Sequence, residues 1–263
     1  MTTPADLPFS LDRDVLVRAP RALVFRFFTD SDRWADWWGA GSTIEGRVGG
    51  ALRIVYPNAI TASGEVLELV PDERIVFTFG YDSGTPIPPG GSRVTLALED
   101  DPRGTRVLLT HHVASAEVRE PHVQGWRYQL ALFANAVANH VHAGAQDTVD
   151  RWFAAWSAEP DALEAALADL LTDDATFQDA HSCLRGPEDI RAHVAAARMH
   201  MPGITMARSG PARHCQGTVL ADWSAAGPDG AVVAGGTNVF ELAPDGRLAR
   251  VIGVWSPPTP GDA

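Results

Sequence analysis

Residues 125–156, GWRYQLALFANAVANHVHAGAQDTVDRWFAAW, contain the point at which the hydrophobic pattern of the chain ends and starts again. In the first half of this stretch, apolar residues recur every three or four positions, as on one side of a helix. These residues are Trp126, Leu130, Phe133, Val137 and Val141. Small residues interrupt the pattern at 143–145, and a second apolar stripe begins with Val149. We therefore expect two helices here, each belonging to a different folded part of the chain.

The residues before this stretch alternate between apolar and polar side chains in several segments, which is typical of β-strands. We expect strands over 14–18, 51–56, 62–70, 74–81, 92–99 and 105–113. Two short helices are expected between the first two strands, and Asp30 or Ser31 can cap the second. The long helix, expected over 124–142, follows the last strand. A curved antiparallel sheet that closes on such a helix forms a helix-grip, and we assign this α+β domain to residues 12–143.

The residues after the stretch run in the opposite order, with helices first and strands afterwards. One helix begins near residue 147, and a second is capped by Asp161 with Glu164 completing a capping box. A third helix follows residue 186. Strands are expected over 175–179, 204–208, 216–224, 231–242 and 248–255. The sequence therefore predicts a second α+β domain over residues 146–257.

The composition of the 263-residue chain excludes several classes of function. Its formal net charge is −12 and neither half is basic, so we expect no nucleic-acid partner. The chain has no lysine, which excludes Schiff-base chemistry and a Walker-type phosphate loop. It has no run of about 18 apolar residues, so we expect no membrane segment. The two cysteines form no disulfide framework, and we expect a cytoplasmic protein.

Several short motifs of the first half occur together and in a fixed order. They are 18–20 (RAP), 24–25 (VF), Asp30 before 37–38 (WW), 49–50 (GG), 70–75 (VPDERI), 104–106 (GTR), 110–111 (TH) and 125–126 (GW). In this combination, residues 12–142 resemble the START-related (SRPBCC) superfamily, in the branch similar to the activator of heat-shock-protein-90 ATPase. The resemblance implies a helix-grip fold with a deep apolar cavity.

Five side chains of the first half are candidates for binding a ligand in that cavity: Trp38, Phe77, Phe79, His111 and Trp126. For each tryptophan, packing in the core is the alternative. For His111, which lies on the apolar face of its strand, the alternative is a core histidine with hydrogen-bond partners.

The second half carries its own set of motifs. They are Trp156 followed by 167–171, the segment 174–179 (DATFQD), Gly186 with Glu188, 222–223 (DW), Gly236, Phe240, and 245–248 (DGRL) leading to Trp255. In this combination, residues 146–256 resemble the SnoaL-like branch of the nuclear transport factor 2-like superfamily. The resemblance implies a cone-shaped α+β barrel, a fold that hosts ketosteroid isomerases, polyketide cyclases, dehydratases and plain binding modules. It also implies a homodimer. The candidate pocket walls are Trp152, Trp156, Phe177, His181, Trp223 and Trp255.

Two polar side chains of the second half are candidates for catalysis. Alternation places Asp179 on the same strand face as Phe177, where loss of hydration would raise the pKa of the carboxyl toward that of a general base. Asn238 shares a face with Phe240 and could donate a hydrogen bond to an enolate oxygen. The resemblance implies the same roles, since Asp179 matches the general base of ketosteroid isomerases. The alternative for Asp179 is a hydrogen bond to the loop 181–185 or a pair with the arginine that ends it.

Three hypotheses of function remain open at this point. The first is an enzyme that abstracts a proton next to a carbonyl of a hydrophobic small molecule in the C-terminal pocket, as an isomerase, cyclase or dehydratase. The sequence carries no cofactor motif and no metal-ligand spacing, so we expect neither a cofactor nor a metal. The second is a carrier or sensor of an apolar metabolite without turnover. The third, from the resemblance of the first half, is a co-factor of a chaperone ATPase.

Overall fold

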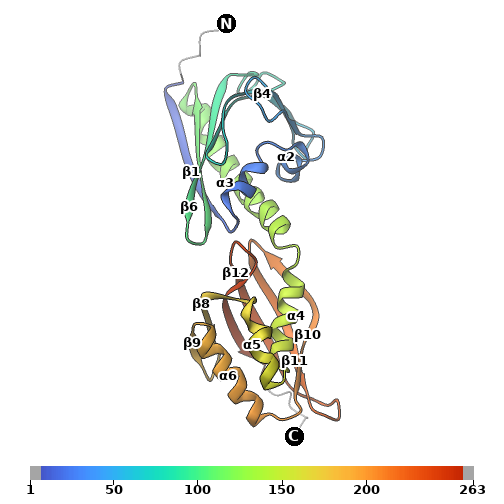
Figure 1. The fold of residues 1–263 in the computed structure, drawn as a ribbon. Helices are drawn as coiled ribbons and strands as arrows, with labels where there is room; N and C mark the ends of the chain where they lie inside the picture. Colours follow the sequence, from blue (N-terminus) through green and yellow to red (C-terminus); the bar gives the residue numbers. More distant parts are fainter. Residues whose placement is uncertain (1–6, 257–263) are drawn as a thin grey trace. The chain divides into compact units, whose positions relative to one another are not determined.

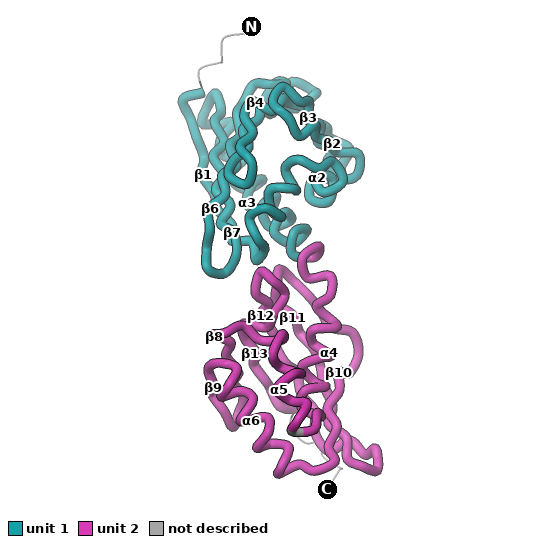
Figure 2. The backbone as a smooth tube through the Cα atoms, in the orientation of Figure 1, with its two compact units in different colours: residues 1–138 teal, residues 139–263 magenta. Residues whose placement is uncertain are grey.

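The computed structural model describes residues 7–256 and divides into two compact units, residues 1–138 and 139–263 (Figures 1 and 2). Each unit combines one β-sheet with helices, which confirms the predicted α+β class. Residue 257, the expected end of the second domain, lies outside the described residues. Among residues 7–256, no helix combines the length and the apolar character needed to cross a membrane.

Unit 1 is built on a seven-stranded antiparallel sheet in the order β1-β7-β6-β5-β4-β3-β2. The strands are β1 (Phe9–Val17), β2 (Thr43–Ile44), β3 (Ala51–Val55), β4 (Thr61–Val70), β5 (Arg74–Tyr81), β6 (Ser92–Asp101) and β7 (Gly104–Val113). The helices are α1 (Arg21–Arg26), α2 (Ser31–Trp38) and α3 (Ala116–Val141). Figure 1 shows the sheet bending around α3, with α2 inside the same curve. This arrangement agrees with the helix-grip expected from the sequence.

Aromatic rings from the segment around α1 and α2 form the core of unit 1 against α3. Phe28 stacks on Phe133 of α3 with ring centroids 5.1 Å apart, and Trp37 meets Phe133 edge-on at 5.0 Å. Such pairs add about 0.5–1.5 kcal/mol each beyond the burial of their surface. The Asp30 carboxylate caps α2 by accepting hydrogen bonds from two backbone N–H groups of its first turn. The cap and the rings together hold Trp38, the last residue of α2, in a fixed place.

The long helix α3 begins at Ala116, eight residues before the expected start. The residues before His122 include Glu117, Arg119 and Glu120, so the apolar stripe does not extend over them, and Pro121 in the second turn removes one backbone donor. The Ser115 hydroxyl oxygen accepts a hydrogen bond from the Val118 N–H, which satisfies one of the backbone donors that the first turn of a helix leaves without a partner. The early start matters because it brings His122 onto the helix, one turn before Trp126.

Unit 2 is built on a six-stranded sheet in the order β10-β11-β12-β13-β8-β9. The strands are β8 (Leu171–Gln178), β9 (Cys183–Arg185), β10 (Thr205–Cys215), β11 (Thr218–Ala226), β12 (Val232–Leu242) and β13 (Leu248–Trp255). The helices are α4 (Ala145–Ala155), α5 (Pro160–Ala168) and α6 (Pro187–His200), which Figure 1 shows on one side of this sheet. All neighbouring strands are antiparallel except β13 and β8, which are parallel.

The expected capping box at the start of α5 is wrong. The helix begins at Pro160, and its N-cap is Glu159, which makes no side-chain capping hydrogen bond. The fixed φ angle of proline suits the first helical position, so the helix starts one residue before the proposed cap, Asp161. Asp161 therefore lies in the first turn, where a carboxylate is stabilised by the helix dipole.

Candidate functional site

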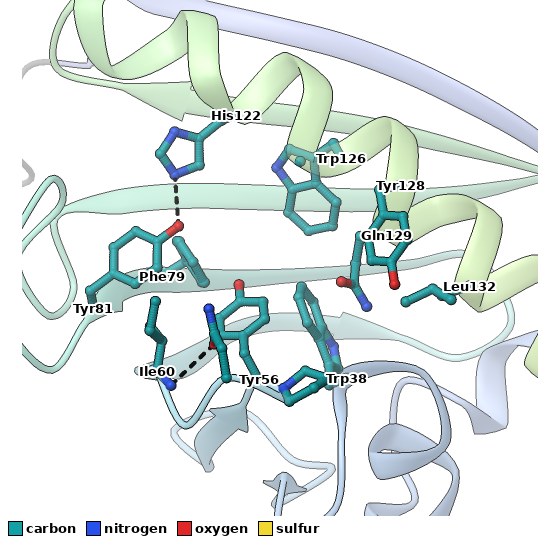
Figure 3. A pocket seen from close by; sticks show the side chains of 13 residues that line it. Trp38, Tyr56, Ile60, Phe79, Tyr81, His122, Trp126, Tyr128, Gln129 and Leu132 are labelled. Atoms are coloured by element: carbon teal, nitrogen blue, oxygen red, sulfur yellow. Dashed lines mark hydrogen bonds between the residues drawn. The ribbon is translucent and has the colours of Figure 1, made fainter.

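Unit 1 contains a cavity of about 260 Å³, partly open to solvent, between α3 and the strands that face it (Figure 3). Its walls are mainly aromatic and carry no acidic side chain and no arginine among the described residues. The residues that line it are Trp38, Tyr56, Pro57, Asn58, Ile60, Phe79, Tyr81, His122, Gly125, Trp126, Tyr128, Gln129 and Leu132. A buried cavity of about 150 Å³ is enough to bind benzene, so this one has room for a molecule of one or two rings.

A tyrosine and a histidine form a hydrogen-bonded pair in the cavity wall. The Tyr81 hydroxyl lies 3.2 Å from Nε2 of His122 (Figure 3). Nδ1 of His122 lies 2.6 Å from the carbonyl oxygen of Val118. A carbonyl only accepts, so Nδ1 carries the proton and Nε2 is the acceptor of a neutral ring. Burial lowers the pKa of His122, although its hydrogen bond to Val118 acts in the opposite direction, and burial raises the pKa of Tyr81. Both side chains are therefore uncharged at neutral pH.

A second chain of hydrogen bonds lies directly behind the wall. The Trp126 indole N–H donates to Nδ1 of His111 at 2.9 Å, and Nε2 of His111 lies 2.8 Å from the hydroxyl of Ser92. Ser92 in turn donates to the carbonyl oxygen of Phe79 at 2.7 Å. His111 is fully buried, and burial is the main cause that lowers its pKa to about 3, with His122 and His112 adding to the effect. Through these hydrogen bonds, the neutral His111 fixes the positions of two wall residues, Trp126 and Phe79.

Three of the five predicted ligand-binding residues of unit 1 line the cavity: Trp38, Phe79 and Trp126. The other two do not. Phe77 packs edge-on against Trp34 in the core at 5.8 Å, and His111 lies behind the wall as the hydrogen-bonded core histidine that was the alternative. Neither side chain reaches the cavity, because Trp34 lies against Phe77, and the rings of Phe79 and Trp126 lie against His111.

Six polar wall residues were missed: Tyr56, Asn58, Tyr81, His122, Tyr128 and Gln129. A signal existed for three of them. Tyr81 continues the alternating face of Phe79, and on a helix His122 and Gln129 fall on the same side as Trp126, four residues before it and three after it. The histidine escaped notice because the helix was expected to begin after it. Tyr56 follows the end of β3 and carried no signal of its own.

Unit 2 contains a much smaller cavity, of about 30 Å³, which has room for one or two water molecules. The residues that line it are Trp156, Phe177, Asp179, Met201, Met206, Trp223, Asn238, Gly253 and Trp255. The two candidate catalytic residues meet here on either side of Gly253. A Cβ atom on that glycine would lie 3.3 Å from Cβ of Asp179 and 3.4 Å from Oδ1 of Asn238. The strand pairing therefore brings the predicted carboxylate and amide to one point.

The Asp179 carboxylate is held by the turn that follows β8. Its Oδ1 atom accepts hydrogen bonds from the His181 backbone N–H at 2.8 Å and from the Ser182 hydroxyl at 2.7 Å. Partial burial raises the pKa of this carboxyl, but hydrogen bonds from Ser182, His181 and Trp255 outweigh it, and the net pKa lies below the usual value. The expected rise in pKa is therefore wrong, because the donors of the turn stabilise the charged form. The structure shows the hydrogen bond to the 181–185 loop that was the alternative.

Aromatic packing fills most of the space that the sequence assigned to the C-terminal pocket. Trp152 is fully buried against Phe177 and does not line the cavity. Trp156 also packs on Phe177, with ring centroids 5.6 Å apart, and Trp223 meets Trp255 edge-on at 5.2 Å. His181 is exposed, and its ring lies against Trp255 at 5.7 Å. Within residues 7–256, no group of three or more histidine, cysteine or acidic side chains is arranged to hold a metal ion.

Comparison with known proteins identifies both halves. The family model described as Activator of Hsp90 ATPase homolog 1-like protein matches residues 18–138, and the model of the SnoaL-like domain matches residues 149–251. No curated protein matches the chain.

Similar solved structures cover one half each. One is a SnoaL-like family protein from Agrobacterium tumefaciens str. C58, provisionally named an isomerase, with 25% identity, 45% of this chain and 99% of that chain covered, and a TM-score of 0.41. A second is the Aha1 dimer from Colwellia psychrerythraea, with 17% identity, 49% and 96% coverage, and a TM-score of 0.42. A third is CalU16 from Micromonospora echinospora, with 23% identity, 50% and 77% coverage, and a TM-score of 0.40. The chain thus joins a domain of the Activator of Hsp90 ATPase homolog 1-like family, residues 18–138, to a SnoaL-like domain, residues 149–251.

Proposed function

We propose that unit 1 binds a neutral, mainly apolar small molecule in the cavity between α3 and the sheet. The observation that carries this proposal is the cavity of about 260 Å³, walled by aromatic side chains without a formal charge. Burial of apolar ligand surface stabilises a complex by about 25 cal/mol per Å². A charged ligand would lose its hydration there without an ionic partner, which costs several kcal/mol. We therefore expect unit 1 to bind uncharged aromatic compounds.

The test uses a residue at the mouth of the cavity. Gly125 lies on α3 and lines the cavity, and a Cβ atom there would meet no other atom within 4 Å. Gly125→Phe would place a ring in the opening without a backbone clash, and Gly125→Ala is the matched control, since it adds one methyl group. Naphthalene is the probe, and the readouts are ligand-observed NMR and the shift of the thermal midpoint, which rises with ligand concentration over Kd.

We expect naphthalene to bind the wild-type protein and Gly125→Ala, and to bind Gly125→Phe at least about 10-fold more weakly, a change of about 1.4 kcal/mol. Equal binding to Gly125→Phe and the wild type, or no binding to either, would refute the proposal. Circular dichroism of Gly125→Phe shows whether the variant keeps its fold.

A second proposal concerns unit 2, where Asp179 and Asn238 meet at one small cavity. We propose that Asp179 removes a proton next to a carbonyl group while Asn238 donates a hydrogen bond to the oxygen. Two observations rank this below the first proposal. The cavity has room for only one or two water molecules, and the hydrogen bonds of the turn lower the pKa of the proposed base. A substrate would have to displace the exposed edge of Trp255 to enter.

The probe for this activity is cyclohex-3-enone, whose conversion to the conjugated enone is followed by ultraviolet absorbance. The α-proton passes to Asp179 and returns to the γ-carbon, so that no other reagent is consumed. Asp179→Asn removes the base, and Asp173→Asn, in the exposed part of β8, is the control. Isomerisation by the wild type and the control, but not by Asp179→Asn, would support the proposal. Equal rates in all three proteins would remove Asp179 from the mechanism.

A further inference from the structure

We propose that the unit 1 cavity selects a neutral aromatic ligand that bears a hydroxyl group, such as a phenol, over the corresponding ether or ketone. This inference rests on the proposed binding function and adds the chemical class of the ligand. It follows from the directions in which the polar groups of the wall can still form hydrogen bonds, and in particular from the two tyrosines that lie together at one end.

The Tyr81 hydroxyl is fixed as an acceptor toward the cavity. Its partner His122 donates from Nδ1 to the carbonyl oxygen of Val118 at 2.6 Å, so Nε2 has no proton and must accept from Tyr81. The single hydroxyl proton of Tyr81 is therefore committed to His122. What remains for a ligand is the lone pairs of the Tyr81 oxygen, and only a donor can use them.

A second acceptor is fixed in the same way. The side-chain amide nitrogen of Gln129 donates to the backbone carbonyl oxygen of Trp37, which orients the amide. Its Oε1 atom accepts no hydrogen bond from the described residues, and Gln129 lines the cavity. An amide oxygen can only accept hydrogen bonds, so this position also favours a ligand that donates.

Tyr56 supplies the complementary donor. It stacks beside Tyr81 with ring centroids 6.5 Å apart, and its hydroxyl has no hydrogen-bond partner among the described residues. Burial, with the nearby Tyr81, raises the pKa of Tyr56, so its proton stays in place. A ligand hydroxyl between the two rings can donate to Tyr81 and accept from Tyr56. A ketone or an ether can only accept, and leaves the Tyr81 oxygen without a partner.

The experiment compares four naphthalene probes of similar size: 2-naphthol, 2-methoxynaphthalene, 2-acetylnaphthalene and naphthalene itself. A buried polar group left without a partner costs about 1–3 kcal/mol, which corresponds to roughly 5- to 150-fold in Kd. We expect 2-naphthol to bind the wild-type protein about 10-fold more tightly than the other three. In Tyr81→Phe this preference falls to about 2-fold or less. Thr95→Val, which removes a hydroxyl from β6 at a residue that does not line the cavity, is the control and keeps the preference.

A second variant tests the direction of the hydrogen bond rather than its presence. His122→Leu removes the acceptor of the Tyr81 proton and leaves the hydroxyl free to donate. We expect the affinity for 2-acetylnaphthalene to rise and the preference for 2-naphthol to disappear, because both tyrosines can then donate to the ketone oxygen. A simple loss of packing would instead weaken all four probes together.

The possible failures are distinguishable. If all four probes bind the wild type with the same affinity and Gly125→Phe weakens them all, the cavity is a binding site and the inference of a hydroxyl ligand is wrong. A preference for 2-naphthol that survives Tyr81→Phe would also overturn it. If none of the probes binds, the proposed function itself is wrong, and the inference falls with it.

Discussion

The buried histidine behind the cavity wall makes the stability of unit 1 sensitive to acid. His111 is fully buried, and its pKa in the folded protein is about 3, against 6.5 in the unfolded chain. Below pH 6.5 the unfolded chain therefore takes up a proton that the folded chain refuses, and the free energy of unfolding falls as the pH falls. Each pH unit in this window is worth about 1.4 kcal/mol, so the loss between pH 6.5 and 4.5 is roughly 2–3 kcal/mol.

The matched variant is His111→Gln, which does not titrate. Its amide oxygen can accept from Trp126 and its amide nitrogen can donate to Ser92, so both hydrogen bonds of the imidazole have a replacement. The carboxylates titrate in both proteins, and their contributions cancel in the difference between the two. His122 lies against His111, with ring centroids 5.4 Å apart, so the coupling between the two histidines is part of the measured difference. We therefore expect the variant to lose roughly 2–3 kcal/mol less than the wild type over this pH range.

The assay is a urea titration at several pH values, followed by NMR through the indole N–H signal of Trp126, which reports on unit 1 alone. The chemical shift of this signal should also differ strongly between the wild type and His111→Gln, because in the wild type the N–H donates to His111. If the wild type and His111→Gln lose the same stability between pH 6.5 and 4.5, the reasoning is refuted, and the acid sensitivity of unit 1 must come from other groups.

Three further predictions concern other parts of the chain. Asp179→Asn should destabilise unit 2 by about 1–2 kcal/mol at pH 7 in thermal denaturation, and this difference should shrink as the pH falls below the ordinary carboxyl pKa of 3.8, because the hydrogen bonds that lower the pKa of Asp179 stabilise only its charged form. Gly64→Ala should prevent unit 1 from folding or cost more than about 3 kcal/mol, since a Cβ atom there would lie 1.7 Å from the carbonyl oxygen of Thr78; near-normal circular dichroism and stability would contradict this. Arg208 of β10 donates to both carboxylate oxygens of Asp150 of α4, at 2.8 and 2.9 Å. A double-mutant cycle with Arg208→Met and Asp150→Asn should therefore give a coupling free energy of about 1 kcal/mol. A coupling free energy near zero would show that this contact does not stabilise unit 2.

The sequence predicts the fold well where side chains repeat with a regular period. The apolar stripe that contains Trp126 and Phe133 identified the long helix, and the alternation of Phe77 and Phe79 identified β5. Helix ends were less predictable, because they depend on a few polar groups. The start of α3 was hidden by Pro121, and the start of α5 was set by a proline where a carboxylate cap was expected.

The candidate site was harder to predict, because periodicity shows which face a residue occupies and not how far it lies from a cavity. Phe77 and Phe79 share a face of β5, yet Phe77 packs in the core and Phe79 lines the cavity. Asp179 was placed correctly beside Asn238, but the donors of its own turn reverse the expected change in its pKa. The cytoplasmic location, the homodimer and the absence of a cofactor stay predictions.

The one parallel pair of strands has a consequence for how the second half of the chain is made. Among the strands that the structure describes in unit 2, β13 leaves the ribosome after all the others, and it lies between β12 and β8, the first strand of the unit. Until it emerges, β8 and β9 have no neighbour in the remaining sheet, and the backbone groups on that edge of β8 stay unpaired. All strands that the structure describes in unit 1 have been synthesised by Val113, so unit 1 can fold while the sheet of unit 2 is still incomplete. Chaperones and proteases act on such partly folded chains.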